Sequence, residues 1–204
     1  MFLDDVQFDL RGWRNRNRIR GPNGTFWLTI PVKSHHLRSS GTRIRQVEID
    51  WSRAWNKKHL KSLQASYSKA PFFSRYSNLL HRFYSRKDRQ LSEFVIEFNI
   101  ALAGELGILD TDFLMSSSLG EQGEKTERLV RIVQRVGADT YLTGPAAKNY
   151  LDESQFANAG IRLEYAEYGY PDYPQLYPGF VGQVSILDLL FMTGTSAPSY
   201  IWER

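Results

Sequence analysis

Cysteine is absent from this 204-residue sequence, and so are long apolar runs. The lack of cysteine excludes a disulfide scaffold, a thiolate zinc or iron–sulfur site and a cysteine nucleophile. No stretch reaches the roughly 18 apolar residues that a membrane-spanning helix needs. The opening MFLDDVQFDL has two adjacent aspartates where a signal peptide has a basic segment and an apolar run. These absences predict a cytoplasmic protein with no transmembrane segment.

Composition is that of a folded globular chain, with 42% hydrophobic, 14% aromatic and 24% charged residues. The formal net charge of +4 is unevenly distributed. Residues 1–62 carry 13 Lys and Arg against 5 Asp and Glu, whereas the rest of the chain carries 13 against 17. Such a basic segment attracts phosphate-bearing partners, which include nucleic acid, nucleotide-activated metabolites and anionic lipid.

β-forming and turn residues dominate the N-terminal part of the chain. Runs rich in Phe, Val, Trp, Ile and Thr predict strands at residues 2–8, 26–32 and 47–51, and GPNG at 21–24 is typical of a turn. Between the first two strands the sequence predicts a basic loop over residues 9–25. We therefore expect an N-terminal β-ribbon that carries a basic loop.

The remainder alternates between helices and short strands. Apolar residues recur at three- and four-residue intervals in several segments, and glycines stand where those segments end. A helix, a glycine and a strand in succession are typical of a sheet with packed helices. We predict a single α/β domain over residues 1–204, with a mixed β-sheet. The predicted helices lie at residues 60–67, 72–84, 91–102 and 129–136, from Pro145, after Asp152 and at 185–193 with Gly194 beyond. The predicted strands lie at 108–115, 138–143 and 161–165.

The densest polar segment is DDVQFDLRGWRNRNRIRG. Arginine offers forked donors for phosphate or carboxylate, asparagine both donates and accepts hydrogen bonds, and tryptophan supplies a stacking face. In an extended chain, the RNRNR alternation directs the arginines to one side and the asparagines to the other. The alternative is a solvated basic loop that pairs with the acidic remainder. The candidate substrate-binding residues here are Arg11, Trp13, Asn15, Arg16, Asn17 and Arg18.

Five blocks of the sequence resemble, in order, the WbqC-like protein family, and they span Asp4 to Gly194: DDVQFxxRGWxNRNRI, FWLTIPV, WxxKHLKSLQASYxKAPFF, GADTYLTGPAAKNYLDESQFANAGI and SILDLLFMTG. Some members of this largely uncharacterised bacterial family lie in O-antigen or other surface-polysaccharide gene clusters, and a glycine-transfer role has been suggested. The resemblance therefore implies a transferase of glycine or a related aminoacyl group in surface-polysaccharide biosynthesis.

One departure from the family concerns the N-terminus. Members usually begin with a strand, a motif resembling QPxYxPxxGYF and a helix, before the segment that matches residues 2–8 of this chain. The resemblance thus implies truncation at the N-terminus. If the upstream motif belongs to the active site, the present chain is expected to be inactive.

Asp4 and Asp5 are the candidate catalytic residues. They are expected at the C-terminal end of a strand, where ligand sites of open α/β sheets gather, and one of the two would face a ligand. In aminoacyl transfer to a sugar hydroxyl or amine, that carboxylate would act as general base or hold a magnesium ion with a phosphate. The alternative role is a cap that orders the arginine-rich loop.

Three other positions are candidates for substrate binding. Thr143 and Gly144 precede the helix that Pro145 opens, which would leave backbone N–H groups free for an anion. A tight structural turn is the alternative there. His59 lies in the KHLK part of a family block, so the resemblance implies a place near the site, and a helix-surface role is the alternative.

No metal site is predicted from the histidines, because His35, His36, His59 and His81 show neither HxxxH nor HxH spacing and no cysteine accompanies them. Asp188 interrupts the apolar run SILDLLF. A carboxylate in such a helix is exposed or deliberately paired, so we expect a structural anchor with an arginine of the basic segment as its partner.

Three functions compete at this level. The first is the aminoacyl transferase, which acts on a small-molecule or sugar-nucleotide substrate. The second is a non-catalytic module that binds an anion or a sugar nucleotide. The third is a nucleic-acid binder, which the basic segment favours and which the acidic remainder and the lack of a known motif oppose. Neither the oligomeric state nor any cofactor follows from the sequence.

Overall fold

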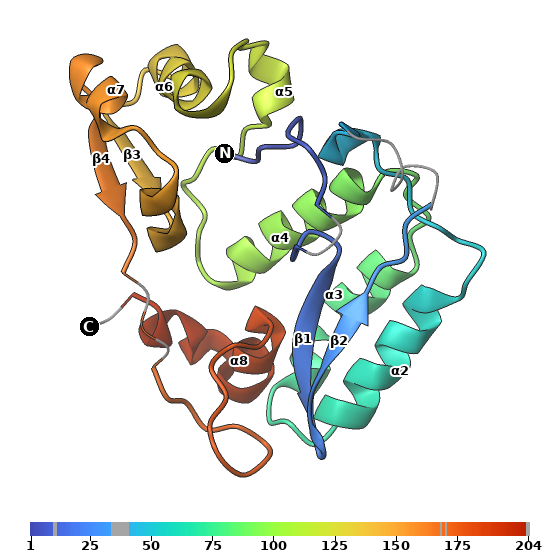
Figure 1. Cartoon of the computed structure of the whole chain (residues 1–204). Coiled ribbons are helices and arrows are strands. Elements are labelled where there is room, and N and C mark those ends of the chain that lie inside the picture. Colours follow the sequence, from blue (N-terminus) through green and yellow to red (C-terminus); the bar gives the residue numbers. More distant parts are fainter. Residues whose placement is uncertain (10–11, 34–40, 168, 170, 203–204) are drawn as a thin grey trace. The chain divides into compact units, whose positions relative to one another are not determined.

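The computed structural model describes residues 1–9, 12–33, 41–167, 169 and 171–202 (Figure 1). The chain divides into two compact units. Unit 1 comprises Met1–Asp4 and Phe113–Gly169, and unit 2 comprises Asp5–Asp112 and Tyr170–Arg204. Each unit has a hydrophobic cluster of its own.

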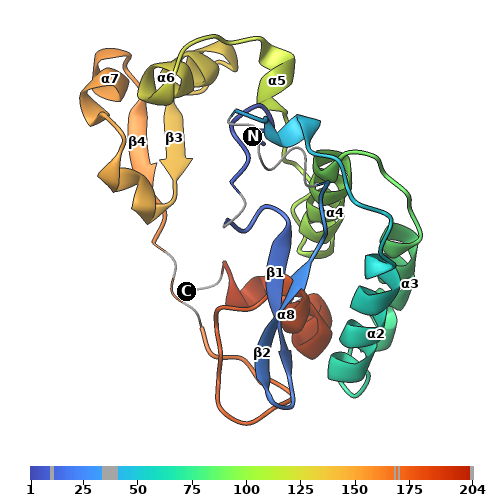
Figure 2. The ribbon, with the colours of Figure 1, turned by 45° about the vertical axis from the view of Figure 1, so that its right-hand side comes forward.

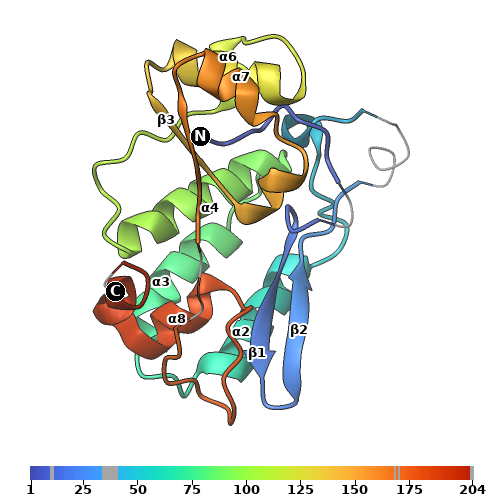
Figure 3. The same cartoon turned by 60° about the vertical axis from the view of Figure 1, so that its left-hand side comes forward.

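Unit 2 begins with an antiparallel ribbon, visible as paired arrows in Figure 3. Strands β1 (Arg16–Gly21) and β2 (Gly24–Thr29) are joined by a tight turn at Pro22 and Asn23, so the predicted turn is confirmed. The basic segment, however, is itself a strand rather than a loop between strands. The strand predicted at 2–8 is wrong, because those residues form a turn flanked by two isolated bridges.

Helices pack around this ribbon. They bury the apolar residues whose three- and four-residue spacing predicted these helices. At their centre, Phe191 is fully buried, and its ring lies 5.1 Å from those of Tyr67 and Phe73. The strand predicted at 47–51 is reduced to isolated bridges. In the described part of unit 2 the helices are η1 (Ile44–Gln46), α2 (Trp55–Tyr67), α3 (Phe73–Tyr84), α4 (Leu91–Glu105), α8 (Ile186–Thr193) and η3 (Gly194–Tyr200).

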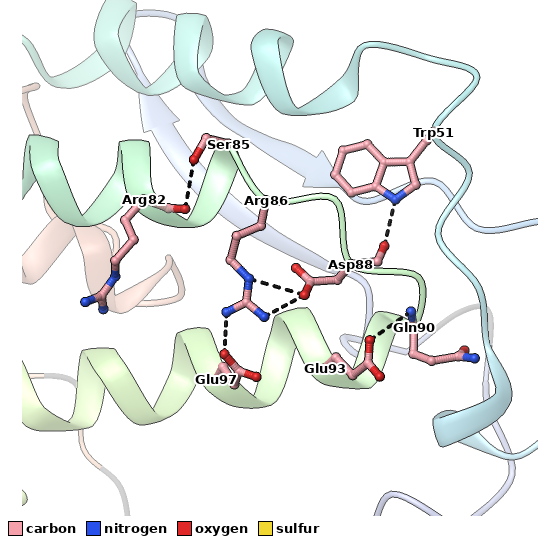
Figure 4. A network of polar contacts seen from close by, with 8 residues as sticks. All are labelled: Trp51, Arg82, Ser85, Arg86, Asp88, Gln90, Glu93 and Glu97. Atoms are coloured by element: carbon pink, nitrogen blue, oxygen red, sulfur yellow. Dashed lines mark hydrogen bonds and ion pairs between the residues drawn. The ribbon is translucent and has the colours of Figure 1, made fainter.

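A polar network fixes the turn between α3 and α4 (Figure 4). Arg86 donates to Asp88 Oδ1 from Nε at 3.2 Å and from Nη2 at 2.5 Å, and its Nη1 binds Glu97 on α4. Trp51 Nε1 donates to the backbone oxygen of Asp88 at 2.7 Å. The guanidinium also lowers the pKa of Glu97. These contacts set the direction in which α4 leaves the turn, and one face of α4 lines the pocket described below.

Asp188 on α8 is a buried anchor, 1% exposed, as predicted. Its carboxylate accepts hydrogen bonds from Tyr67 Oη at 2.8 Å, Tyr173 Oη at 2.8 Å and Gln175 Nε2 at 2.9 Å. The expected arginine partner is wrong for the described residues. Arg20 instead donates to Gln175 Oε1, so a glutamine side chain stands between the guanidinium and the carboxylate.

Unit 1 is built around a parallel strand pair, β3 (Thr140–Thr143) and β4 (Arg162–Tyr165), shown side by side in Figure 2. Both strands and the helix cap at Asp152 were predicted. The Asp152 carboxylate accepts from Ser154 N at 3.1 Å. The strand predicted at 108–115 is wrong, since only Met115 forms a bridge. The described helices of unit 1 are α5 (Ser116–Leu119), α6 (Lys125–Arg135), η2 (Pro145–Asn149) and α7 (Glu153–Asn158).

The predicted α/β class is confirmed. Within the described residues, the strands form two two-stranded sheets. One sheet is antiparallel and the other is parallel, so the two kinds of strand pairing occur in separate sheets. None of the described helices is long and apolar enough to span a bilayer. That both units act as one domain stays a prediction.

Candidate functional site

Unit 2 contains a pocket of about 160 Å³. Its walls are mostly apolar and aromatic, whereas one side is made of the polar segment that precedes and begins β1. Five sequence-predicted residues meet here: Trp13, Asn15, Arg16, Asn17 and His59. The other lining residues are Arg14, Ile19, Leu28, Ile30, Tyr84, Phe94, Val95, Phe98, Asn99, Leu102, Ser185, Ile186 and Leu187.

Asn15 is 6% exposed and forms two hydrogen bonds with the backbone of Ile30. Its Nδ2 donates to the Ile30 oxygen at 3.0 Å, and Ile30 N donates to the Asn15 backbone oxygen at 2.8 Å. The first bond fixes the amide orientation, because a flipped amide would set two oxygens against each other. Oδ1 is buried and has no hydrogen-bond partner among the described residues. An unpaired buried acceptor in a pocket wall favours a ligand that brings an N–H or O–H donor.

Arginine and tryptophan stack on the face of β1 that carries the basic residues. The guanidinium of Arg16 lies 4.4 Å from the Trp27 ring centre, and that of Arg18 lies 5.4 Å from Trp13 and 5.6 Å from Trp27. Both arginines thus share one side, as the alternation predicted. Cation–π contacts of this kind hold the guanidinium groups in place. Arg18 Nη2 also donates to Gln183 Oε1 at 2.9 Å, and Arg18 does not line the pocket in the described structure.

His59 contributes a neutral imidazole to the pocket wall. It is 7% exposed and packs edge-on against Trp55, 5.1 Å between ring centres. Nε2 lies 3.1 Å from the Thr29 carbonyl oxygen, which can only accept, so Nε2 carries the proton and Nδ1 has the lone pair. Burial lowers the pKa of His59 to about 4, and the Thr29 hydrogen bond opposes that shift.

The aspartate pair is divided between the units. Asp4 belongs to unit 1 and is 7% exposed. Its carboxylate accepts from Ser117 N at 2.9 Å, Ser117 Oγ at 2.6 Å and Ser116 Oγ at 3.2 Å, at the start of α5. These bonds tie Asp4 to the start of α5, whereas the predicted alternative was a cap on the arginine-rich loop. Asp5 lies in unit 2, half-buried, and is not among the residues that line the pocket.

Thr143 and Gly144 lie in unit 1 and are not among the residues that line the pocket of unit 2. Thr143 ends β3, and its backbone oxygen accepts from Ala166 N at 2.7 Å. The helix that follows Gly144 is the five-residue η2, which is consistent with a tight turn. Arg11, His35 and His36 lie outside the described residues.

Sequence reasoning missed three polar residues of the pocket: Arg14, Asn99 and Ser185. Arg14 stands in the same arginine-rich run as the chosen residues. Asn99 was detectable as the amide within the apolar stretch of α4. Ser185 is the N-cap of α8, where its Oγ accepts from Leu187 N at 3.4 Å, and nothing in the sequence connects it to Asn15.

Metal ligands do not cluster in the described part of the chain, where no three His, Asp or Glu side chains lie close enough to share an ion. The chemistry of the pocket is therefore described by its amides, guanidinium groups, imidazole and aromatic walls. Such a set suits a ligand with one anionic end and one compact, less polar end.

Two comparisons with known proteins found matches to the sequence. The uncharacterized protein Rv1507c of Mycobacterium tuberculosis is 38% identical over 203 residues, which cover 98% of this chain and 86% of that relative. No solved structure matches the chain. The WbqC-like protein family matches residues 1–200, and the chain belongs to that family.

Proposed function

We propose that this protein binds an anionic small molecule, specifically a sugar nucleotide, in the pocket of unit 2. One observation carries the proposal. The arginine- and asparagine-rich segment, which the sequence singled out for ligand chemistry, forms one side of the pocket, and His59 from α2 joins it there.

The lining indicates how the ligand would lie. A volume of about 160 Å³ is below the roughly 300–1,000 Å³ of sites that enclose a drug-sized ligand, so the pocket would hold one end of a sugar nucleotide. Arg14 and Arg16 provide donors for the diphosphate. The unpaired Oδ1 of Asn15 would accept a hydrogen bond from a sugar hydroxyl or an amide N–H.

Calorimetric titration tests the binding proposal. UDP-N-acetylglucosamine should bind more tightly than either UDP or N-acetylglucosamine, because both ends of the ligand contribute. Arg16→Gln should weaken binding at least tenfold, as expected for the loss of a charge-assisted hydrogen bond of about 1.5–3 kcal/mol. Arg135→Gln is the matched control, since Arg135 is exposed on α6 in unit 1. Equal affinities of Arg16→Gln and the parent would reject this pocket as the site.

A second proposal, which builds on the first, is aminoacyl transfer to the bound sugar, as the family resemblance implies. His59 favours it, because Nε2 carries the proton that faces the Thr29 oxygen, so the Nδ1 lone pair can take the proton from an attacking hydroxyl or amine. The attacking oxygen or nitrogen forms the new bond to the acyl carbon, and the thiol of a thioester donor leaves.

Mass spectrometry separates the two proposals. The parent protein is incubated with a glycyl thioester and the sugar nucleotide, and the product should gain one glycyl group. His59→Gln should bind the sugar nucleotide within about threefold of the parent, yet lose transfer at least a hundredfold, in the range typical of a general base. Tight binding without any glycyl product would leave a non-catalytic binding module and refute the transfer.

A further inference from the structure

A long stretch of the chain has cations and no anions. Residues 51–87 contain nine Lys and Arg and not one Asp or Glu. This stretch includes the whole of α2 and α3 and the turn between them, which contact each other in unit 2 and lie side by side in Figure 2. The imbalance is far stronger here than in the chain as a whole, where 26 basic residues face 22 acidic ones.

Most of these cations are exposed and are not paired with carboxylates. Lys57, Lys58 and Lys61 are exposed on α2, and their spacing of three and four residues places them in one stripe. Arg75 and Arg82 are exposed on α3, seven residues apart on one side of that helix. None of these five forms an ion pair with a carboxylate in the described part of the chain. We call these five residues the basic helix pair.

Neighbouring residues add an apolar contact point. Phe72 precedes α3 in the turn after α2 and is 37% exposed, with the exposed Lys69 close by in the sequence. An exposed aromatic side chain beside lysines is suited to a boundary between water and an apolar phase. Clusters of four to eight cations on amphipathic helices are typical of sites that bind anionic lipid headgroups.

We propose that the basic helix pair docks unit 2 on an anionic phospholipid surface, with Phe72 at the contact. Three isolated ammonium groups on one helix stripe match a flat array of single phosphates, because each lysine acts as a point charge. Nucleic acid is the competing polyanion. Stacking of successive bases needs several exposed aromatic rings among the cations. Among the described residues of this stretch, Phe72 alone is an exposed large apolar side chain, which favours the lipid surface.

Vesicle co-sedimentation tests the proposal with the full chain. Vesicles of phosphatidylcholine alone should not retain the protein, whereas vesicles that also contain phosphatidylglycerol should retain it, with retention lost as sodium chloride rises from about 0.05 to 0.5 M. The triple variant Lys57→Gln, Lys58→Gln, Lys61→Gln should bind roughly a hundredfold more weakly, at a factor of about five for each lysine near an anionic surface.

A matched variant separates the position of the charges from their number. Arg131→Gln, Arg135→Gln, Arg162→Gln removes three exposed cations from unit 1 and should retain binding within about threefold, since the basic helix pair is intact. An equal loss in both triple variants would overturn the proposed location. Equal retention on neutral and anionic vesicles would overturn the electrostatic basis. Tighter binding to a 20-nucleotide DNA than to the anionic vesicles at one salt concentration would overturn the choice of a lipid surface. Circular dichroism of each variant confirms that its helices are intact.

Discussion

Acidification from pH 7.5 to 5 should destabilise this protein through His59. The imidazole is 7% exposed, and burial holds its pKa at about 4 in the folded chain. In the unfolded chain an ordinary pKa of about 6.5 applies. Between these two values the unfolded chain binds a proton that the folded chain does not bind. Stability is therefore complete above about pH 6.5, falls as the pH falls towards 4, and levels off below that value.

The size of the effect follows from the two pKa values. The full difference between about 4 and about 6.5 corresponds to about 3 kcal/mol, and about 2 kcal/mol of it is lost by pH 5. Ion-paired carboxylates such as Glu48, whose pKa its partners Arg89 and Lys33 lower to about 2, affect stability in a more acidic range, because their unfolded pKa values lie near 4. The interval from pH 5 to 7.5 thus isolates the histidine.

Urea unfolding followed by circular dichroism measures this loss at pH 5, 6 and 7.5. His59→Gln keeps an N–H that can donate to the Thr29 oxygen and removes the titrating group, so its stability should change by less than about 0.5 kcal/mol over the same interval. His81→Gln is the control, because His81 is exposed on α3 and its variant should behave as the parent does. A parent-like pH dependence in His59→Gln would refute the reasoning.

Four other substitutions have expected effects on the free energy of unfolding. Gly194→Ala should destabilise by about 2 kcal/mol, because Gly194 has φ +58° and a Cβ there would lie 2.5 Å from the Phe72 ring. By contrast, Gly104→Ala should stabilise by about 0.5 kcal/mol, since Gly104 is an exposed position within α4 where a Cβ meets open space. The reverse order in urea unfolding would contradict this. Asp188→Ala should destabilise by about 3 kcal/mol or more, since it removes the buried acceptor of three hydrogen bonds. An unchanged denaturation midpoint would count against the anchor. Asp152→Ala should lower the free energy of unfolding by about 1 kcal/mol, because the N-cap of α7 is lost. Hydrogen exchange should become faster at amides of unit 1 and stay unchanged at amides of unit 2.

Periodic segments were predictable and isolated contacts were not. The stripe from Leu91 to Leu102 predicts α4 because a helix buries residues at three- and four-residue intervals, whatever lies opposite. The strand predicted at 2–8 failed because Asp4 accepts hydrogen bonds from Ser116 and Ser117, far along the chain, and those bonds hold a turn. No local sequence pattern predicts a contact between residues so far apart in the chain.

The candidate site shows the same limit. Arginine and asparagine are weak strand formers, so the segment before residue 21 read as a loop. In the structure, Arg18 pairs across the ribbon with Trp27, and its backbone oxygen accepts from Ser185 N at 2.8 Å. These tertiary contacts outweigh propensity. Residue chemistry still pointed to Asn15 and Arg16, which line the pocket, because a concentration of polar side chains is visible without knowledge of the strand.

The pocket is built from segments near both ends of the polypeptide, which affects when it can form during synthesis on the ribosome. Residues 13–17 line it together with Ser185, Ile186 and Leu187, and Tyr67 is tied to Asp188. A nascent chain that has emerged only to α4 has one wall of the pocket and lacks the other. The face of the β1–β2 ribbon that packs against α8 therefore stays exposed until α8 has left the exit tunnel. The pocket is completed only by the last tenth or so of the chain, so C-terminal truncation during synthesis yields a product that has the arginines but no pocket.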